Sequence, residues 1–335
     1  MAKNSYSNYR GRGNVKKTVV IVALVLVILG AVGYLVAQNY IVYDDAGQRH
    51  LALPKWNKAE RDDKNPVDGD VNIEFVEPPE KWLPVQELHA TQFADGTLKM
   101  DPATVLTQAD EAMLIDVKLI NGAITYTTEV EVSPQIHVEK YDTMANLKTL
   151  LADERYTVAH MYTLCDSYLV RANRDAALHW SNGTFWYDAD GWAWVDPTNA
   201  DVLKYNSDLC KEYAALGFDE ILLDGFSYPV SGRTDAIDLD ENLDRVAILQ
   251  SFAESLRNSL PEDVVLSVVI RSDVKEDFGL SPEMIAACFD RVYIAPGVDA
   301  TALLAALPQE YDRDTRVVQM AYQKPESGSY VLMTQ

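Results

Sequence analysis

The chain has 335 residues, of which 48% are hydrophobic and 10% aromatic, with 29 basic residues against 51 acidic ones and a net charge of −22. Apolar residues are plentiful and fewer than a quarter of the residues are charged, which excludes wholesale disorder. An acidic protein repels the phosphate backbone, so the composition also disfavours nucleic-acid binding.

The charge is sharply segregated along the chain. Residues 1–17 hold five basic side chains and no acidic one, so 24 basic and 51 acidic residues follow them and carry a net charge of −27. Positive charges beside a membrane span stay on the inner side. We therefore expect residues 1–17 to form a cytoplasmic tail.

Residues 18–37 form an uncharged apolar run of twenty residues. As a helix this run would be roughly 30 Å long, about the thickness of the hydrocarbon core of a bilayer. It predicts a transmembrane signal-anchor helix, so that the membrane is one partner and the main domain lies outside the cell membrane. The alternative is a cleaved signal peptide, whose apolar region is usually about 7–15 residues and ends in a small-x-small site. Residues 36–40 offer only a poor site of that kind.

Residues 38–80 mix polar and charged residues with four prolines and show no sustained helical or strand periodicity. This composition predicts an extracytoplasmic linker. Within it, residues 71–76 alternate polar and apolar side chains, and the alternative for them is a strand added to the edge of the domain.

Residues 81–335 alternate β-rich apolar runs with helix-like stretches, over a length typical of one (β/α)8 barrel. Eight candidate strands lie at 85–91, 112–117, 156–164, 219–224, 264–270, 291–295, 316–320 and 330–333. Five helix-like stretches lie at 143–152, 200–216, 241–260, 282–289 and 300–307. Such alternation implies parallel strands covered by helices, so we predict a TIM-like barrel. Its first units are less regular, and residues 121–140 indicate an extended excursion.

The three cysteines, Cys165, Cys210 and Cys288, give an odd number and contain no Cys-x-x-Cys motif. We expect them to be buried small hydrophobes, without a disulfide framework. No His pair has metal-ligand spacing, and residues 188–191 match only part of a calcium loop because its terminal Glu is missing. The sequence therefore predicts neither a metal nor another cofactor.

Acidic residues at strand ends are the candidate catalytic groups, because reacting groups in such barrels lie at the C-terminal ends of the strands. Asp224 ends the fourth strand and precedes an aromatic-rich turn; the alternative is a capping or loop-stabilising role. Asp116 on the second strand and Asp273 after the fifth could supply a second carboxylate. Glycoside hydrolysis ordinarily uses two carboxyl groups.

The loop at 179–194 holds four of the six Trp residues. Flat aromatic faces beside polar groups suit a sugar, since the rings stack on its apolar face. The residues expected to bind substrate are Trp186, Tyr187, Trp192, Trp194, Tyr228, His160 and Asp166. The alternative is that the aromatic residues pack on one another at the barrel rim and that His160 belongs to the core.

Two segments carry a family resemblance. Residues 193–199 read Ala-Trp-Val-Asp-Pro-Thr-Asn, and after a helix residues 216–224 read Leu-Gly-Phe-Asp-Glu-Ile-Leu-Leu-Asp; residues 113–126 carry Ile-Asp-Val-Lys, Gly122 and Ile-Thr-Tyr. This pattern resembles a glycoside hydrolase family of bacterial (β/α)8-barrel proteins that are distantly similar to α-amylases. The likeness runs from about residue 82 to the C-terminus. Such proteins are commonly anchored or secreted in Gram-positive bacteria.

The resemblance implies that Asp224 is the strand-four catalytic carboxylate, a nucleophile, and that the partner is a polysaccharide or oligosaccharide. Two departures stand out: Ser227 occupies a position where the family usually has Arg, and residues 267–270 in strand five lack the expected acid. We therefore expect a glycosidase that acts on cell-wall or other extracellular polysaccharide, with Asp273 or Asp116 as second carboxylate. The alternative is a degenerate barrel that binds glycan, or serves as an envelope scaffold, without turnover.

Overall fold

The computed structural model describes residues 41–43, 49–51, 86–139, 143–240 and 242–334. The chain divides into two compact units, Met1–Phe75 and Val76–Gln335. In the first unit, the described residues form one antiparallel strand pair, β1 (Ile41–Tyr43) with β2 (Arg49–Leu51), inside the segment predicted as a linker.

The predicted cytoplasmic tail, the predicted span at 18–37 and the segment 71–76 lie outside the described residues. In the part of the chain that the structure describes, no helix is both long and apolar enough to cross a membrane.

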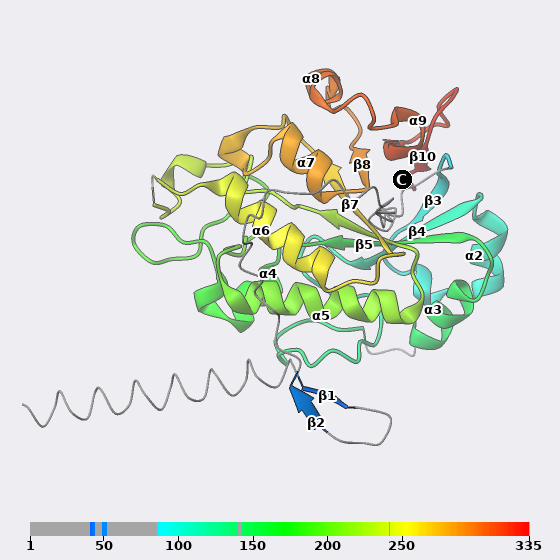
Figure 1. The fold of residues 1–335 in the computed structure, drawn as a ribbon, viewed down its shortest axis with the longest axis horizontal. Coiled ribbons are helices and arrows are strands. Elements are labelled where there is room, and N and C mark those ends of the chain that lie inside the picture. Colours follow the sequence, from blue (N-terminus) through cyan, green and yellow to red (C-terminus); the bar gives the residue numbers. More distant parts are fainter. Residues whose placement is uncertain (1–40, 44–48, 52–85, 140–142, 241, 335) are drawn as a thin grey trace, which may run out of the picture. The chain divides into compact units, whose positions relative to one another are not determined.

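The second unit contains a closed barrel of eight parallel strands (Figure 1). In chain order these strands are β3 (His89–Phe93), β4 (Ala112–Lys118), β5 (Tyr156–Tyr162), β6 (Glu220–Asp224), β7 (Val265–Ile270), β8 (Arg291–Ile294), β9 (Val317–Ala321) and β10 (Tyr330–Leu332). Each strand pairs with the next one along the chain, and β10 closes the barrel against β3. The predicted TIM-like barrel is therefore confirmed for this unit, with a strand near each of the eight predicted positions.

Helices lie between most consecutive strands and cover the barrel from outside (Figure 1). They are α2 (Pro102–Gln108), α3 (Thr143–Leu151), α4 (Ser167–Ala172), α5 (Ala200–Leu216), α6 (Arg245–Asn258), α7 (Pro282–Cys288), α8 (Thr301–Ala306) and α9 (Arg313–Arg316). The five predicted helices correspond to α3, α5, α6, α7 and α8. The additional helices α2, α4 and α9 lie outside the predicted helix-like stretches.

Helix α5 begins and ends where its sequence signals predict. Asn199 caps its start by accepting a hydrogen bond from the backbone N–H of Asp201, and Gly217 ends it in the left-handed conformation at φ 100°. Because Gly217 leads directly into β6, this end point fixes where β6 starts and which residue reaches its carboxyl end.

Alternate residues of the strands point into the barrel and out toward the helices. Val158 and Leu222 belong to the small apolar cluster inside the barrel, whereas Leu223 belongs to the larger cluster beneath the helices. Strand β6 therefore places Glu220, Leu222 and Asp224 inward, in that order. We call the N-terminal end of the strands the floor of the barrel and the C-terminal end its mouth.

The predicted excursion after β4 is confirmed, because residues 119–139 contain only turns and isolated bridges. Glu212 of α5 holds this segment: it accepts hydrogen bonds at 2.6 Å from Thr128 Oγ1 and the backbone N–H of Glu129, and another from the Tyr126 hydroxyl. The segment decorates the barrel between its second and third strands.

Candidate active site

Side chains from five consecutive strands meet at the mouth of the barrel. Gln92 of β3 donates from Nε2 to Asp116 Oδ1 of β4 at 3.0 Å. His160 of β5 joins two carboxylates, its ring nitrogens lying 2.7 Å from Asp116 Oδ1 and 2.9 Å from Asp224 Oδ2 of β6. Arg271, which follows β7, donates from Nε to Asp224 Oδ1 at 2.6 Å and from Nη2 to Oδ2. We call these five residues the mouth network.

Strand register and side-chain alternation bring this network together. Asp116 lies directly opposite His160 in the pairing of β4 with β5. Asp224 lies opposite Tyr162, two residues beyond His160, in the pairing of β5 with β6. Because inward positions recur every second residue, each strand offers one side chain to the mouth.

Asp224 is buried and ionised. Besides Arg271 and His160, the backbone N–H of Gly225 donates to its carboxylate, at 2.7 Å. Burial raises the pKa of Asp224, but the guanidinium of Arg271 and the hydrogen bond from His160 outweigh burial and hold the pKa well below its usual range. An aspartate in this state is suited to act as a nucleophile or as an electrostatic stabiliser, and it is not suited to donate a proton.

His160 is a buried cation at neutral pH. Burial lowers its pKa, whereas the charges and hydrogen bonds of Asp116 and Asp224 raise it by more, to about 9. Both ring nitrogens then carry protons and donate to the carboxylates on either side. His160 is therefore a charged link that fixes two carboxylates, and it has no free nitrogen to act as a base.

A cavity of about 150 Å³ lies at the mouth beside the network. Its wall includes Tyr162, Gly225 and Arg271. Gly225 directly follows Asp224 in the chain, and Arg271 is hydrogen-bonded to the Asp224 carboxylate. These two wall residues therefore lie between Asp224 and the cavity. A cavity of about this volume is large enough for a molecule the size of benzene, and so for one edge of a sugar ring.

The Trp-rich loop reaches this cavity with two of its predicted aromatic residues. Trp192 and Trp194 line the cavity, as a sugar-binding role requires. Trp186 is fully buried, and its Nε1 donates to the backbone carbonyl of Arg233 at 3.0 Å. Trp186 therefore packs inside the fold and does not line this cavity. Tyr187 is exposed but does not belong to the cavity wall.

Tyr228 and Asp166, also predicted to bind substrate, are buried outside the cavity wall. The Tyr228 ring faces the guanidinium of Arg245, 5.2 Å from the ring centroid. Asp166 forms a buried ion pair with Lys118 at 2.7 Å and caps the start of α4. Both side chains therefore make their contacts within the fold and lie outside the lining of this cavity.

Of the three acids predicted to be catalytic, two lie in the mouth network. Asp116 and Asp224 are separated by the imidazole ring of His160. Asp273 instead lines a neighbouring hollow of about 330 Å³, where its side chain is 67% exposed and pairs with Lys275 at 2.9 Å. The structure does not bring Asp273 to the cavity beside Asp224.

Gln92, Tyr162 and Arg271 are mouth residues that the predicted set omits. Side-chain alternation supplies the missing signal: Val269 points into the barrel, so Arg271, two residues later, takes the inward position at the end of β7. The resemblance leads us to expect an acid within residues 267–270, which hold none, and Arg271 occupies the next position of the chain.

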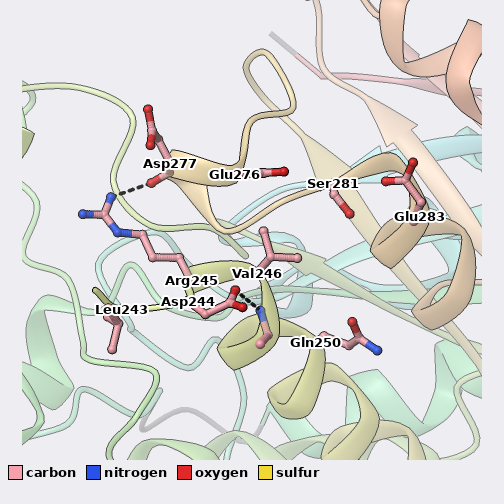
Figure 2. A pocket seen from close by; sticks show the side chains of 10 residues that line it. Leu243, Asp244, Arg245, Val246, Gln250, Glu276, Asp277, Ser281 and Glu283 are labelled. Carbon is pink, nitrogen blue, oxygen red and sulfur yellow. Dashed lines mark hydrogen bonds between the residues drawn. The ribbon is translucent and has the colours of Figure 1, made fainter. Parts of the chain in front are cut away.

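A larger hollow of about 580 Å³ lies between the starts of α6 and α7 (Figure 2). Its acidic side chains include Asp244, which caps α6 by accepting from the N–H of Ala247 at 2.9 Å, and Arg245 donates to the backbone carbonyl of Asp277 at 2.6 Å. Among the described residues, no group of three His, Cys, Asp or Glu side chains is placed to hold a metal ion. Asp244 therefore stabilises the start of α6, and Arg245 holds the loop beside it.

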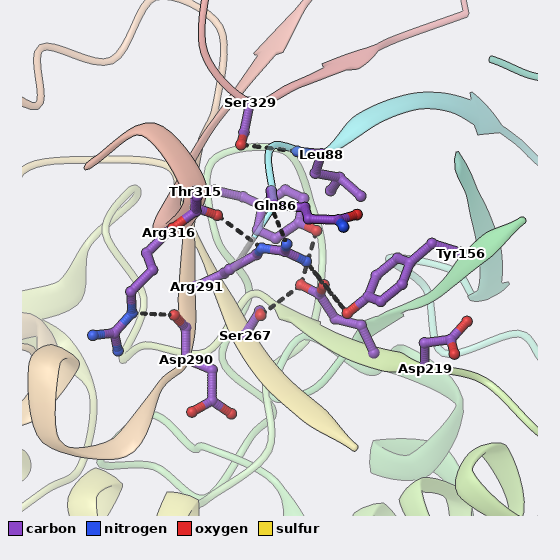
Figure 3. Close-up of polar contacts among 12 residues, drawn as sticks. Gln86, Leu88, Tyr156, Asp219, Ser267, Asp290, Arg291, Thr315, Arg316 and Ser329 are labelled. Carbon is purple, nitrogen blue, oxygen red and sulfur yellow. Dashed lines mark hydrogen bonds and ion pairs between the residues drawn. The ribbon is translucent and has the colours of Figure 1, made fainter. Parts of the chain in front are cut away.

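A second buried charge cluster lies at the floor of the barrel (Figure 3). Arg291 donates from Nη1 to Glu220 Oε2 at 2.6 Å, and to the backbone carbonyls of Thr315 and Gln86 at 3.0 and 3.1 Å. Three hydroxyl groups also donate to Glu220, those of Ser267, Tyr156 and Tyr293. In (β/α)8 barrels this end contributes stability and the opposite end carries the chemistry, so we assign the floor cluster to the fold.

Three solved structures illustrate what the chain is similar to. A hypothetical protein from Ruminiclostridium thermocellum has 23% identity and a TM-score of 0.45, with 53% of this chain and 96% of that chain covered. The glycoside hydrolase domain of PelA from Pseudomonas aeruginosa has 14% identity and a TM-score of 0.42, with 70% and 84% covered. The maltogenic α-amylase AmyB from Thermotoga neapolitana has 14% identity and a TM-score of 0.37, with 59% and 44% covered.

No curated protein matches the chain. The family model described as "putative glycosyl hydrolase domain" (DUF4015) matches residues 82–325, which is nearly the whole of the barrel unit and most of the chain. This range agrees with the resemblance seen in the sequence from about residue 82 onward. The chain therefore belongs to the DUF4015 family.

Proposed function

We propose that the chain is a membrane-anchored, extracytoplasmic glycoside hydrolase that cleaves cell-wall or other extracellular polysaccharide with Asp224 as its nucleophile. The observation that carries this proposal is the state of Asp224: an ionised carboxylate at the end of the fourth barrel strand, beside a cavity lined by Trp192 and Trp194. Membership of a glycosyl hydrolase family supports the reaction class. The uncharged run at 18–37 and the basic tail before it support the anchor.

The mouth network suits the first step of a retaining mechanism. In that mechanism an ionised carboxylate bonds to the anomeric carbon as the glycosidic bond breaks. Arg271 and His160 keep Asp224 ionised, and the half-buried indole of Trp192 at the cavity wall suits the apolar face of a sugar ring. Asp224 is fully buried behind Arg271, whose side chain is 39% exposed, so the guanidinium has to turn aside for the attack.

A second candidate is a barrel that binds glycan without cleaving it. The presence of Arg271 at the inward strand-five position, where it also covers Asp224, favours this candidate. In that case Trp192 carries the binding and Asp224 only holds the network together. An envelope scaffold, the third alternative, predicts no affinity for glycan.

The test is glycan turnover by the full chain purified in detergent, measured as reducing ends released from a polysaccharide panel that includes cell-wall glycan. The matched variants are Asp224→Asn, which keeps the shape of the side chain, and Trp192→Ala. The hydrolase predicts release by the wild type and its loss in Asp224→Asn, with binding retained. Retention of the anomeric configuration in the first product, read by NMR, supports a nucleophile.

A folded wild type that binds glycan but releases no reducing ends contradicts the hydrolase and favours the binding barrel, especially if Trp192→Ala abolishes binding. Absence of any glycan binding leaves the scaffold alternative.

The anchor is tested separately by membrane fractionation of cells that express the full chain or a chain without residues 18–37. The proposal expects the full chain in the membrane fraction, accessible to external protease, and the shortened chain outside that fraction. A full chain found in the soluble fraction contradicts the anchor.

A further inference from the structure

A tight turn in the Trp-rich loop brings Asp190 to the cavity wall. Tyr187 and Ala193 form an antiparallel bridge at its base, and the N–H of Asp188 donates to the carbonyl of Trp192 at 3.0 Å. Asp188 Oδ1 accepts from the N–H groups of Asp190 at 3.0 Å and Trp192 at 2.8 Å, which holds the turn in one shape. Asp188, Asp190 and Trp192 all line the cavity.

The other carboxylates near the cavity already use both of their oxygens as hydrogen-bond acceptors. Asp224 accepts from Arg271, His160 and a backbone N–H. Asp116 accepts from Gln92 and His160. Asp188 accepts from two backbone N–H groups and, on Oδ2, from an indole N–H at 2.9 Å. A proton on one of these carboxyls would displace one of these donors, so none of the three is arranged to deliver a proton.

Asp190 differs from these three acids. Its side chain is exposed at the cavity, and within the described ranges its carboxyl makes no hydrogen bond or ion pair. A proton on either oxygen breaks no contact. We infer that Asp190, on the loop after the third barrel strand, is the general acid and base of the reaction, in place of the acid that strand five lacks. This inference rests on the proposed hydrolase function.

The reaction proceeds in two steps, formation of an ester between the sugar and Asp224 and hydrolysis of that ester. Asp224 bonds to the anomeric carbon while the glycosidic C–O bond breaks, and the proton of the Asp190 carboxyl moves to the leaving oxygen, which departs as an alcohol. A water molecule then gives a proton to the Asp190 carboxylate and its oxygen to the anomeric carbon, while the ester bond to Asp224 breaks. The sugar leaves as a hemiacetal, and both side chains return to their starting states.

The experiment compares the full chain with Asp190→Asn and, as the matched control, with Asp263→Asn, an exposed acid just before β7 at the floor of the barrel. Each protein is assayed on the panel glycan that the wild type cleaves fastest. Each is also assayed on the 2,4-dinitrophenyl glycoside of the sugar that this cleavage releases, because such a leaving group needs no proton. Azide is added to each assay, since it can replace the activated water. Circular dichroism checks the fold.

We expect Asp190→Asn to lose about 10²–10⁴-fold in glycan turnover. It should keep a bond-breaking rate near that of the wild type on the activated glycoside, and azide should restore turnover as a glycosyl azide. Asp263→Asn should match the wild type. If Asp190→Asn stays within a few fold of the wild type on glycan, or falls equally on both substrates without azide rescue, the inference is wrong and the hydrolase stands. A wild type without turnover overturns the hydrolase and the inference together.

Discussion

Removal of Arg291 from the floor cluster is expected to destabilise the barrel strongly. In Arg291→Met the apolar part of the side chain is largely kept, but Glu220 loses its cation while it stays fully buried. The backbone carbonyls of Thr315 and Gln86 also lose their guanidinium donor. The variant therefore leaves one uncompensated charge and two unpaired acceptors in the floor of the barrel.

The expected loss is about 3–5 kcal/mol in the free energy of unfolding, the usual cost of removing one partner of a buried ion pair. For a unit of this size that loss lowers the melting temperature by roughly 6–20 °C. The matched control is Arg155→Met, because Arg155 is partly exposed and pairs with Asp153 near the surface. A surface pair of that kind contributes about 0–1 kcal/mol.

The assay is urea unfolding of the full chain in detergent, followed by tryptophan fluorescence and far-UV circular dichroism. A double variant, Glu220→Gln with Arg291→Met, removes both charges and should recover part of the loss, since no buried charge is then left alone. If Arg291→Met loses less than about 1 kcal/mol in the free energy of unfolding, the floor cluster does not stabilise the fold as a buried ion pair. The same conclusion follows if the effects of the two substitutions simply add in the double variant.

Three further predictions concern the mouth and its loops. The pKa of His160 is raised from 6.5 to about 9, so its protonation stabilises the fold fully below about pH 6.5. About 3 kcal/mol of the free energy of unfolding should be lost as the pH rises through about 9. Urea unfolding of the wild type and of His160→Gln across this pH range tests the prediction, and an equal pH dependence of the two proteins refutes it. Gly122→Ala should lower the free energy of unfolding, measured by thermal melts, by at least about 2 kcal/mol more than Gly183→Ala does. Both glycines have positive φ, but only at Gly122 would a Cβ lie 1.8 Å from a buried carboxylate oxygen. Trp186→Ala should cost about 3–5 kcal/mol of stability, whereas Trp192→Ala should mainly weaken glycan binding in affinity electrophoresis; similar effects of both on binding would contradict the placement of Trp186 in the core.

The barrel could be predicted from the sequence because each of its elements carries its own local signal. Strand β6 is an apolar run between a helix-ending Gly217 and the acid Asp224, and helix α5 has a cap at one end and Gly217 at the other. The first strand is the least accurate: the apolar run suggests 85–91, while β3 spans His89–Phe93. An apolar run marks burial, but the ladder with a neighbouring strand decides where the strand itself begins.

The site could be predicted only in part, because its contacts depend on register between strands far apart in the sequence. The end of β6 indicates Asp224 and the third strand indicates His160, but nothing local says that Asp116 lies opposite His160. The Trp-rich loop shows the same limit. Spacing cannot tell that Trp186 turns into the core while Trp192 lines the cavity, since that depends on the bridges within the loop.

The inward alternation of β6 also separates stability from chemistry along one strand. Glu220 lies at the floor, Leu222 in the apolar layer and Asp224 at the mouth, so the two carboxylates are about 13 Å apart along the strand, at roughly 3.3 Å per residue. At an effective dielectric constant of about 20, one unpaired charge at that distance changes the energy of a charge at the mouth by only about 1 kcal/mol. Arg291→Met should therefore lose less than about tenfold in glycan turnover when assayed well below its melting temperature. Its expected loss in the free energy of unfolding is larger, about 3–5 kcal/mol. A larger loss in a variant shown to be folded would mean that the floor positions the mouth network through the backbone of β6, and that the apolar layer around Leu222 does not insulate one end of the barrel from the other.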